Sequence, residues 1–334
     1  MKQNHPIIFI LGSPRSGTTM MGRILGNNPL VCTFKELHFF EKLSTASDID
    51  RKLNFQEAID LASRLCFANK RTLKSRNDYK KYNKNAFDII KRIPEDNFFP
   101  ISIYTAFLKY TTEQAGKKIS CEQTPGYVFY LKEILSLYPN AKIINMVRDP
   151  RDVILSQKKR WKRYYKHNLY LSARTWMNYN VITTSKLWTS AINNANAFKH
   201  HERVCFVKFE NILENPEHEV QKICDFIGID YSDNMLNVPM TGSSLIPDTP
   251  EKKIIDKTRT LNWIQGLNQS EIFFIQKIAL KNMKQNDYQP VKAIPNLLFM
   301  SFYFFLFPVK LFFAMFFHSI DIKDLSIAIK RRIG

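Results

Sequence analysis

The sequence lacks the cysteine and histidine patterns that hold disulfide-bonded or metal-binding proteins together. Its five cysteines are odd in number and lie far apart, so no disulfide framework is predicted. Most of them stand within apolar stretches, where small buried thiols in a reduced compartment are the usual interpretation. The seven histidines show no metal-ligand spacing, and no bound metal is expected.

Patterns of secretion and of DNA binding are absent as well. Only five residues precede Pro6, which leaves no room for a signal peptide, so we expect a cytoplasmic protein. There is no zinc-finger spacing and no basic region joined to heptads, so nucleic acid is not expected as a partner. The 49 Lys and Arg against 30 Asp and Glu give a net charge of +19. Such a charge attracts nucleotides, sulfated or phosphorylated acceptors, or an acidic membrane face.

The most informative stretch is residues 6–25, PIIFILGSPRSGTTMMGRIL. Ile7–Ile10 is an apolar run that predicts a strand buried on both faces. Gly12 and Gly17 follow with the spacing of a phosphate-binding P-loop, and an apolar-periodic helix comes next. Backbone N–H groups and the helix dipole make such a loop an anion site.

The loop departs from the form found in enzymes that hydrolyse nucleoside triphosphates. Thr18 stands where those loops have a Lys, and Arg15 supplies the cation from within the loop instead. The segment Pro14–Thr19, PRSGTT, resembles the 5′-phosphosulfate loop of sulfotransferases that use 3′-phosphoadenosine 5′-phosphosulfate (PAPS). The bacterial and tyrosylprotein sulfotransferases have the most similar pattern. The resemblance implies that PAPS is the co-substrate and that Arg15 is also catalytic. The residues that it implies for binding the 5′ end of PAPS are Arg15, Ser16, Gly17, Thr18 and Thr19.

Further strands are predicted over residues 31–34, 119–122, 141–147 and 204–209. Because they alternate with helical segments, the predicted fold is α/β, with a P-loop-like parallel sheet flanked by helices. A single long helix is expected over about 171–198. Residues 45–115 are helical in pattern and are interpreted as an insert that caps the sheet, within one sulfotransferase-like domain over residues 1–290.

A second basic motif follows the strand over 141–147. Arg148 leaves the end of this strand, and Ser156 lies in the next predicted helix. An Arg with a hydroxyl partner suits a terminal phosphate, and the pair resembles the 3′-phosphate motif of the family. Arg160, one turn further along the same predicted helix, matches a basic position of the tyrosylprotein branch. The alternative is an Arg148 that is paired with a neighbouring aspartate.

Two further positions are implied only by the resemblance. Phe209 falls where the tyrosylprotein branch has a Tyr that contacts adenine, although a core Phe is an equally open interpretation. Lys257 belongs to a basic cluster, with Lys252 and Lys253, that corresponds roughly to a late PAPS-binding loop; a Ser243-Ser244 loop precedes it.

The general base needs a carboxylate or a His near the transferred group. Glu36 follows Arg15 by 21 positions, which is the spacing from the loop Arg to the catalytic Glu in the tyrosylprotein sulfotransferases. His38 is the rival base, because cytosolic sulfotransferases use His. Gln123 occupies the place where the family usually has a Lys that stabilises the leaving group, so the source of that charge is an open point.

The composition changes after Pro295, and residues 296–320 are dominated by Phe, Leu and Met. The segment is long enough to cross a bilayer, but Lys310 at its centre makes that costly. We predict two short helices broken at Pro308, which dip into or lie on an acidic inner leaflet, with the basic end over 324–332 supporting surface binding. A single span and a docking or dimer helix pair are the alternatives for this tail, residues 291–334.

Together these patterns predict PAPS-dependent sulfation of a hydroxyl acceptor, on a glycan or a lipid-linked molecule, with a tyrosine also open. The alternative enzyme class is a P-loop kinase or NTPase, which the absence of Lys at position 18 argues against. A third hypothesis is a non-catalytic peripheral protein that binds anionic lipid or nucleotide.

Overall fold

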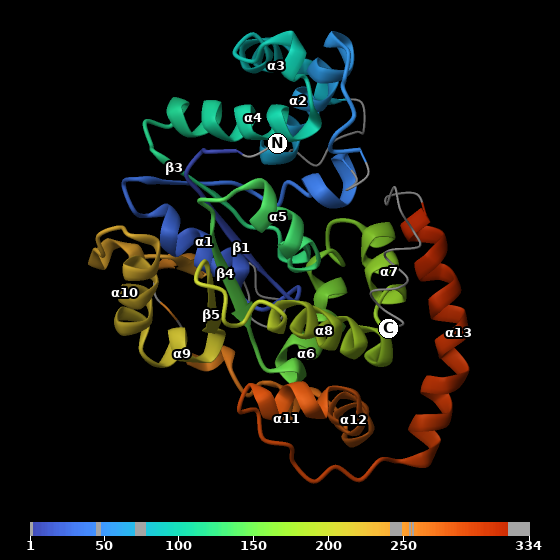
Figure 1. Ribbon diagram of the computed structural model, residues 1–334. Helices are drawn as coiled ribbons and strands as arrows, with labels where there is room; N and C mark the ends of the chain where they lie inside the picture. The colour runs from blue at the N-terminus through green and yellow to red at the C-terminus, as the bar shows by residue number, and fades with distance from the viewer. Residues whose placement is uncertain are drawn as a thin grey trace.

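A five-stranded parallel sheet runs through the centre of the fold (Figure 1). The computed structural model describes residues 3–44, 48–70, 78–240, 249–253, 255 and 257–319. The strands of the sheet are β1 (Ile7–Gly12), β2 (Val31–Thr33), β3 (Ile119–Glu122), β4 (Lys142–Val147) and β5 (Val204–Lys208). They lie close to where the sequence predicts them, and the predicted α/β class with a parallel sheet is confirmed.

The strand order β2-β3-β1-β4-β5 determines where a ligand site can form. After β1 the chain forms β2 at the edge and then β3 between β2 and β1, and it then forms β4 and β5 on the other side of β1. In open α/β sheets, ligands bind beyond the carboxyl ends of the strands where the order reverses. Gly12, at the end of β1, is in register with Met146 near the end of β4. The loop after β1 and the segment after β4 therefore leave the sheet side by side.

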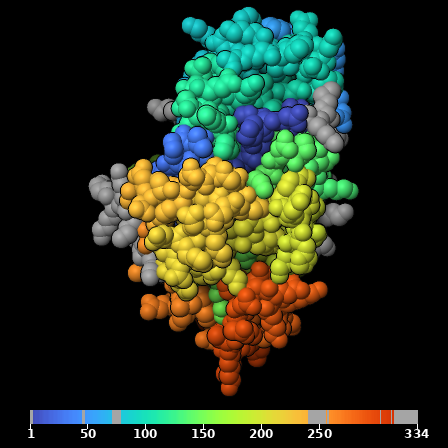
Figure 2. Space-filling view, turned by 60° about the vertical axis from the view of Figure 1, so that its left-hand side comes forward, coloured from blue at the N-terminus to red at the C-terminus, as the bar shows by residue number. Residues whose placement is uncertain are grey.

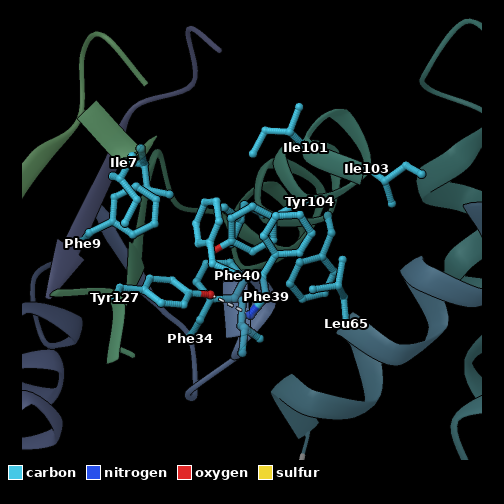
Figure 3. Packing of buried hydrophobic residues seen from close by; sticks show 14 of the residues in the cluster. Ile7, Phe9, Phe34, Phe39, Phe40, Leu65, Ile101, Ile103, Tyr104 and Tyr127 are labelled. Atoms are coloured by element: carbon cyan, nitrogen blue, oxygen red, sulfur yellow. Dashed lines mark hydrogen bonds between the residues drawn. The ribbon is translucent and has the colours of Figure 1, made fainter. Parts of the chain in front are cut away.

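Alternate residues of β1 face two separate hydrophobic clusters, as the pleat of a strand requires. Ile7 and Phe9 belong to the cluster shown in Figure 3, together with aromatic residues from α4 (Pro100–Gln114). Ile8 and Ile10 belong to a second cluster on the other face. That cluster includes residues of α1 (Thr18–Gly26), α9 (Phe209–Glu214) and α10 (Pro216–Ile227).

The segment interpreted as a helical insert contains α2 (Phe55–Lys70), α3 (Asn83–Ile90) and α4. In the space-filling view these helices form the lobe at one end of the molecule, coloured cyan (Figure 2). Their buried side chains belong to the same cluster as Phe9 of β1. The lobe therefore shares one continuous core with the sheet.

One helix prediction is wrong. The single helix expected over 171–198 is two helices, α7 (Leu169–Met177) and α8 (Val181–Asn196). The side chain of Asn180 accepts hydrogen bonds from the backbone N–H groups of Ile182 and Thr183, so it caps a new helix start. The preceding helix α6 (Pro150–Lys158) is capped by Asp149 and ends before Arg160, which lies on the 3₁₀ turn η5 (Arg160–Arg163). The interpretation of Arg160 as part of the same helix as Ser156 is thus corrected, because α6 is shorter than the pattern indicated.

The tail also differs from its prediction. Instead of two short helices broken at Pro308, one helix, α13 (Leu297–Ser319), continues through the proline. It lies along the outside of the molecule beside α7 (Figure 1). Two helices, α11 (Trp263–Gly266) and α12 (Gln269–Gln285), precede it. Within the described residues, no helix meets the length and apolarity needed to span a membrane.

The remaining regular elements are short. Helix α5 (Leu131–Leu137) follows the 3₁₀ turn η4 (Pro125–Tyr130), and the short π-helix η1 (Phe39–Leu43) follows β2. The strands β6 (Pro239–Met240) and β7 (Thr249–Lys253) form an antiparallel pair where the sequence indicated only a loop. Ser243 and Ser244 lie outside the described residues.

Candidate active site

The loop between β1 and α1 leaves the first turn of α1 open to a ligand. Gly17 occupies the N-cap with φ 97° and cannot cap the helix with a side chain. The first N–H groups of the helix are therefore available to an anion. Ser16 is fully buried, and its Oγ has no hydrogen-bond partner among the described residues. A buried hydroxyl of this kind is typical of a site whose ligand supplies the missing partner.

Arg15, which has φ 79°, joins the loop to the motif after β4. Its Nε donates to Oγ of Ser156 at 3.0 Å. Nη1 of Arg148 donates to the backbone carbonyl of Arg15 at 3.2 Å. The structure thus brings together the two basic motifs that the sequence singled out, although 133 positions separate Arg15 from Arg148.

The guanidinium of Arg148 is held over the ring of Phe209, with Cζ 4.2 Å from the ring centroid. Its Nη2 donates to the backbone carbonyl of Arg259 at 2.6 Å. The Nε atoms of Arg148 and Arg259 are buried, and neither has a partner within the described parts of the chain. Buried cationic N–H donors without partners suit an anionic ligand.

The aspartates beside Arg148 have other hydrogen-bond partners. Asp149 forms an ion pair with Arg151 at 2.7 Å. Asp152 accepts hydrogen bonds from the backbone N–H groups of Leu261 and Trp263, and burial raises its pKa to about 6. Asp152 therefore ties α6 to the segment that carries Arg259, which supports the position of Arg148.

Several cations share this site. Burial, together with repulsion from Arg160, Arg163 and Arg148, lowers the pKa of Arg15 to about 10, while Glu36 opposes the change. Burial likewise lowers the pKa of Arg148, although nearby carboxylates oppose it. An anion placed among these groups would relieve the repulsion.

Glu36, His38 and Glu41 form a chain of polar contacts beside the loop. Nε2 of His38 lies 3.2 Å from Oε2 of Glu36, and Nδ1 lies 2.5 Å from Oε2 of Glu41. Burial alone would lower the pKa of His38, but the hydrogen bonds with the two carboxylates outweigh it, so the pKa is raised. His38 also has φ 53°, a left-handed backbone that is uncommon for residues other than glycine.

Glu122, at the end of β3, positions the segment that carries Glu36 and His38. Its Oε1 accepts from the backbone N–H of Leu37 at 3.1 Å, and its Oε2 accepts from that of Thr124 at 3.0 Å. The carboxyl is fully buried, and burial raises its pKa to about 8. A buried titratable group next to a candidate base is typical of functional sites.

The other predicted residues take the following places. Thr18 is buried and Thr19 half-buried at the start of α1, while Gln123 lies against α1 at Gly22. Phe209 is buried beneath Arg148, which favours a supporting role over direct stacking on a base. Lys257 begins the 3₁₀ turn η7 (Lys257–Arg259); its side chain, and those of Lys252 and Lys253, lie outside the described residues.

Sequence reasoning missed Glu41, Glu122, Arg163 and Arg259. Glu122 ends a predicted strand at the sheet edge where ligands bind, so its position was a usable signal. Arg163 and Arg259 lie in the same basic clusters as Arg160 and Lys257 but were not assigned to the site, and Glu41 stands in a segment without a motif. Among the described residues, no group of three His, Cys, Asp or Glu side chains could hold a metal ion.

The fold and these contacts define a P-loop-like α/β protein in which the segments after β1 and β4 meet around buried cationic and hydroxyl groups. The model of the Sulfotransferase family matches residues 6–233. The chain therefore belongs to the Sulfotransferase family, as the loop Pro14–Thr19 predicted.

Individual relatives agree with this membership. A "putative protein-tyrosine sulfotransferase" of Caenorhabditis briggsae is 31% identical over 117 residues, which are 35% of this chain and 39% of that protein. The nodulation protein NoeE of Sinorhizobium fredii is 23% identical over 235 residues, which are 67% of this chain and 50% of that protein. The chain thus spans half or less of the length of these relatives. The solved sulfotransferase domain from the curacin biosynthetic pathway has a TM-score of 0.51 at 20% sequence identity. The match covers 87% of this chain and all of that domain, which shows that the two share a fold.

Proposed function

We propose that this protein transfers the sulfuryl group of PAPS to a hydroxyl acceptor. The observation that carries the proposal is the junction of the two basic motifs, in which Arg148 donates to the carbonyl of Arg15 and Arg15 donates to Ser156. The residues fit an anionic nucleotide, because Ser16 Oγ and Arg148 Nε are buried without partners among the described residues. PAPS supplies the sulfuryl group and carries a second phosphate that an Arg–Ser pair can recognise.

In this proposal the loop holds the 5′ end of PAPS and the segment after β4 holds its 3′-phosphate. The 5′ site comprises Arg15, Ser16, Gly17, Thr18 and Thr19. The 3′ site comprises Arg148 and Ser156, with Arg160 and Lys257 as further basic contributors. The charge that develops on the leaving phosphate is then stabilised by Arg15, since Gln123 brings none.

Glu36 is the proposed general base. The acceptor oxygen forms a bond to sulfur as the bond from sulfur to the phosphate oxygen of PAPS breaks, and Glu36 accepts the acceptor's hydroxyl proton. The geometry favours Glu36 over His38, because the contacts of His38 with two carboxylates raise its pKa and keep it protonated over a wider pH range. A protonated imidazole cannot accept a further proton.

The proposed acceptor is a hydroxyl on a glycan or a lipid-linked molecule, handled at the cytoplasmic face of a membrane. The strong positive charge of the chain, +19, and the apolar α13 support this choice. A tyrosine acceptor, suggested by the names of two relatives, is distinguished by the assay below.

Binding is tested with adenosine 3′,5′-bisphosphate, the product of PAPS. At about 100 times its dissociation constant, the ligand adds about 2.7 kcal/mol to the unfolding free energy, so the melting temperature rises measurably. ATP with Mg²⁺ should raise it far less. Equal stabilisation by ATP would favour a kinase or NTPase instead.

Catalysis is tested with radiolabelled PAPS and a membrane extract, followed by identification of the labelled product. Glu36→Gln should lower turnover by about 10²–10⁴-fold while binding of the bisphosphate persists. His38→Asn is the matched variant. An active Glu36→Gln together with an inactive His38→Asn would assign the base to His38, and binding without any transfer would indicate a non-catalytic protein.

A further inference from the structure

Helix α13 is apolar on all sides, but only one of its faces is covered by the rest of the protein. On the inner face, Tyr303 packs against Phe274 of α12, with ring centroids 6.2 Å apart, and its hydroxyl accepts from Nδ2 of Asn268 at 3.2 Å. Met300 and Tyr303 also pack against the hydrophobic cluster that includes Phe274. Inner-facing residues thus recur with helical spacing at 300, 303 and 310.

Lys310 belongs to this inner face. Its Nζ donates to the backbone carbonyls of Trp176 and Tyr179 at 3.5 and 3.1 Å, and it lies 4.0 Å from the ring centroid of Trp176. A cation at the carboxyl end of a helix such as α7 is favourable. The central charge that, in the sequence, argues against a membrane span therefore points into the protein.

The outer face of α13 carries large apolar side chains in contact with solvent. Leu298 is 82% exposed, Phe305 75% and Phe312 65%, and these positions follow one another at helical spacing. Other exposed apolar residues of the helix extend the surface: Leu297, Phe299, Val309 and Phe313. A helix that is hydrophobic all round is normally buried, so this face is expected to have a partner.

The neighbouring segment combines exposed rings with positive charge. Residues 158–174 contain seven Lys and Arg and no Asp or Glu. Tyr165, Leu169 and Tyr170 of this segment are exposed. The segment includes the N-terminal part of α7, the helix that packs against α13, and it includes η5, which carries the arginines that affect the pKa of Arg15. Apolar rings interspersed with cations suit the surface of an acidic membrane.

We propose that the outer face of α13 and the segment 158–174 form one surface that docks onto an acidic phospholipid membrane. Charge complementarity favours this occupant over a second copy of the chain, because two molecules of charge +19 repel each other. In this arrangement the helix lies in the interface and does not cross the bilayer. One consequence rests on the proposed function. Because η5 belongs to this surface and its arginines affect Arg15, an acceptor carried by the membrane reaches the site from that side.

The test is co-sedimentation of the full chain with vesicles of phosphatidylcholine that contain about one-third phosphatidylserine. We expect binding to these vesicles, weaker binding to pure phosphatidylcholine, and a decrease as salt is raised. The double substitution Phe305→Ser/Phe312→Ser should lower the vesicle affinity by about a hundredfold or more, since each buried Phe contributes about tenfold or more. Phe87→Ser is the matched control, because Phe87 is an exposed ring on α3, outside this surface.

A wild-type chain that stays in the supernatant, or a double variant that binds as the wild type does, overturns the proposal. The proposal is also overturned if the wild type is a dimer in size-exclusion chromatography and the double variant is a monomer, because a second copy of the chain then covers the outer face of α13. Bisphosphate binding, measured on the same samples, is expected to be unchanged in every variant. If vesicles are bound but the bisphosphate is not, the docking surface stands and the proposed sulfuryl transfer fails.

Discussion

Replacing Gly17 with Ala tests whether the loop after β1 is the nucleotide site. Gly17 has φ 97°, and a Cβ at this position would lie 2.4 Å from Cδ2 and 2.8 Å from Cε2 of Phe209. The ring of Phe209 is buried and supports the guanidinium of Arg148. The added methyl group must therefore displace the ring, and with it the Arg that the proposal assigns to the 3′-phosphate.

Two costs add up in this variant. The left-handed backbone costs a residue with a Cβ about 1–2 kcal/mol, and overpacking of a buried ring costs about 1–3 kcal/mol more. We expect the unfolding free energy of Gly17→Ala to fall by about 2–5 kcal/mol. Affinity for adenosine 3′,5′-bisphosphate, measured by titration calorimetry, should fall by at least about tenfold, as expected for a lost charge-assisted hydrogen bond.

Gly228→Ala is the matched control. Gly228 has φ 84°, so it carries a similar backbone cost, but a Cβ there meets nothing within 4 Å. This variant should lose only about 1–2 kcal/mol and should bind the bisphosphate as the wild type does. The reasoning is refuted if Gly17→Ala and Gly228→Ala lose the same stability, or if Gly17→Ala keeps its full affinity for the nucleotide.

Three further variants test other parts of the structure. Lys117→Met removes a cation whose Nζ donates to the carbonyls of Gly26, Asn28 and Val31 at 2.8, 3.2 and 2.6 Å. Chemical denaturation should show that the free energy of unfolding falls by about 2–3 kcal/mol. The control Lys118→Met, at an exposed position, should show almost no change. Burial raises the pKa of Glu122 from 4.5 to about 8. The folded state therefore binds the proton more tightly than the unfolded state, and the free energy of unfolding decreases as the pH rises through this range. Melting temperatures measured from pH 5 to 9 should decline less in Glu122→Gln than in the wild type. Glu41→Gln removes one of the carboxylates that raise the pKa of His38, so an NMR titration of the ring should give a lower pKa, and an unchanged value would contradict the contact.

The core of the fold and the loop after β1 could be predicted from the sequence because their signals are local. A strand buried on both faces is an apolar run, such as Ile7–Ile10, and a P-loop-like turn needs glycine where φ is positive, as at Gly17. These requirements act within a few residues, so the residues themselves carry them. The alternation of strands and helices then restricts the sheet to parallel order.

Tertiary structure alone decided which distant residues meet. Arg259 lies 111 positions from Arg148, and Glu122 lies 85 positions from Leu37, and no local pattern encodes such a pairing. The tail is the clearest case. Its sequence shows a charge at the centre of an apolar helix, but only the packing of α13 against α7 directs Lys310 toward the carbonyls of Trp176 and Tyr179. The direction of a side chain on a helix is determined by what the helix packs against, and a helix that is apolar on every side carries no signal for that choice.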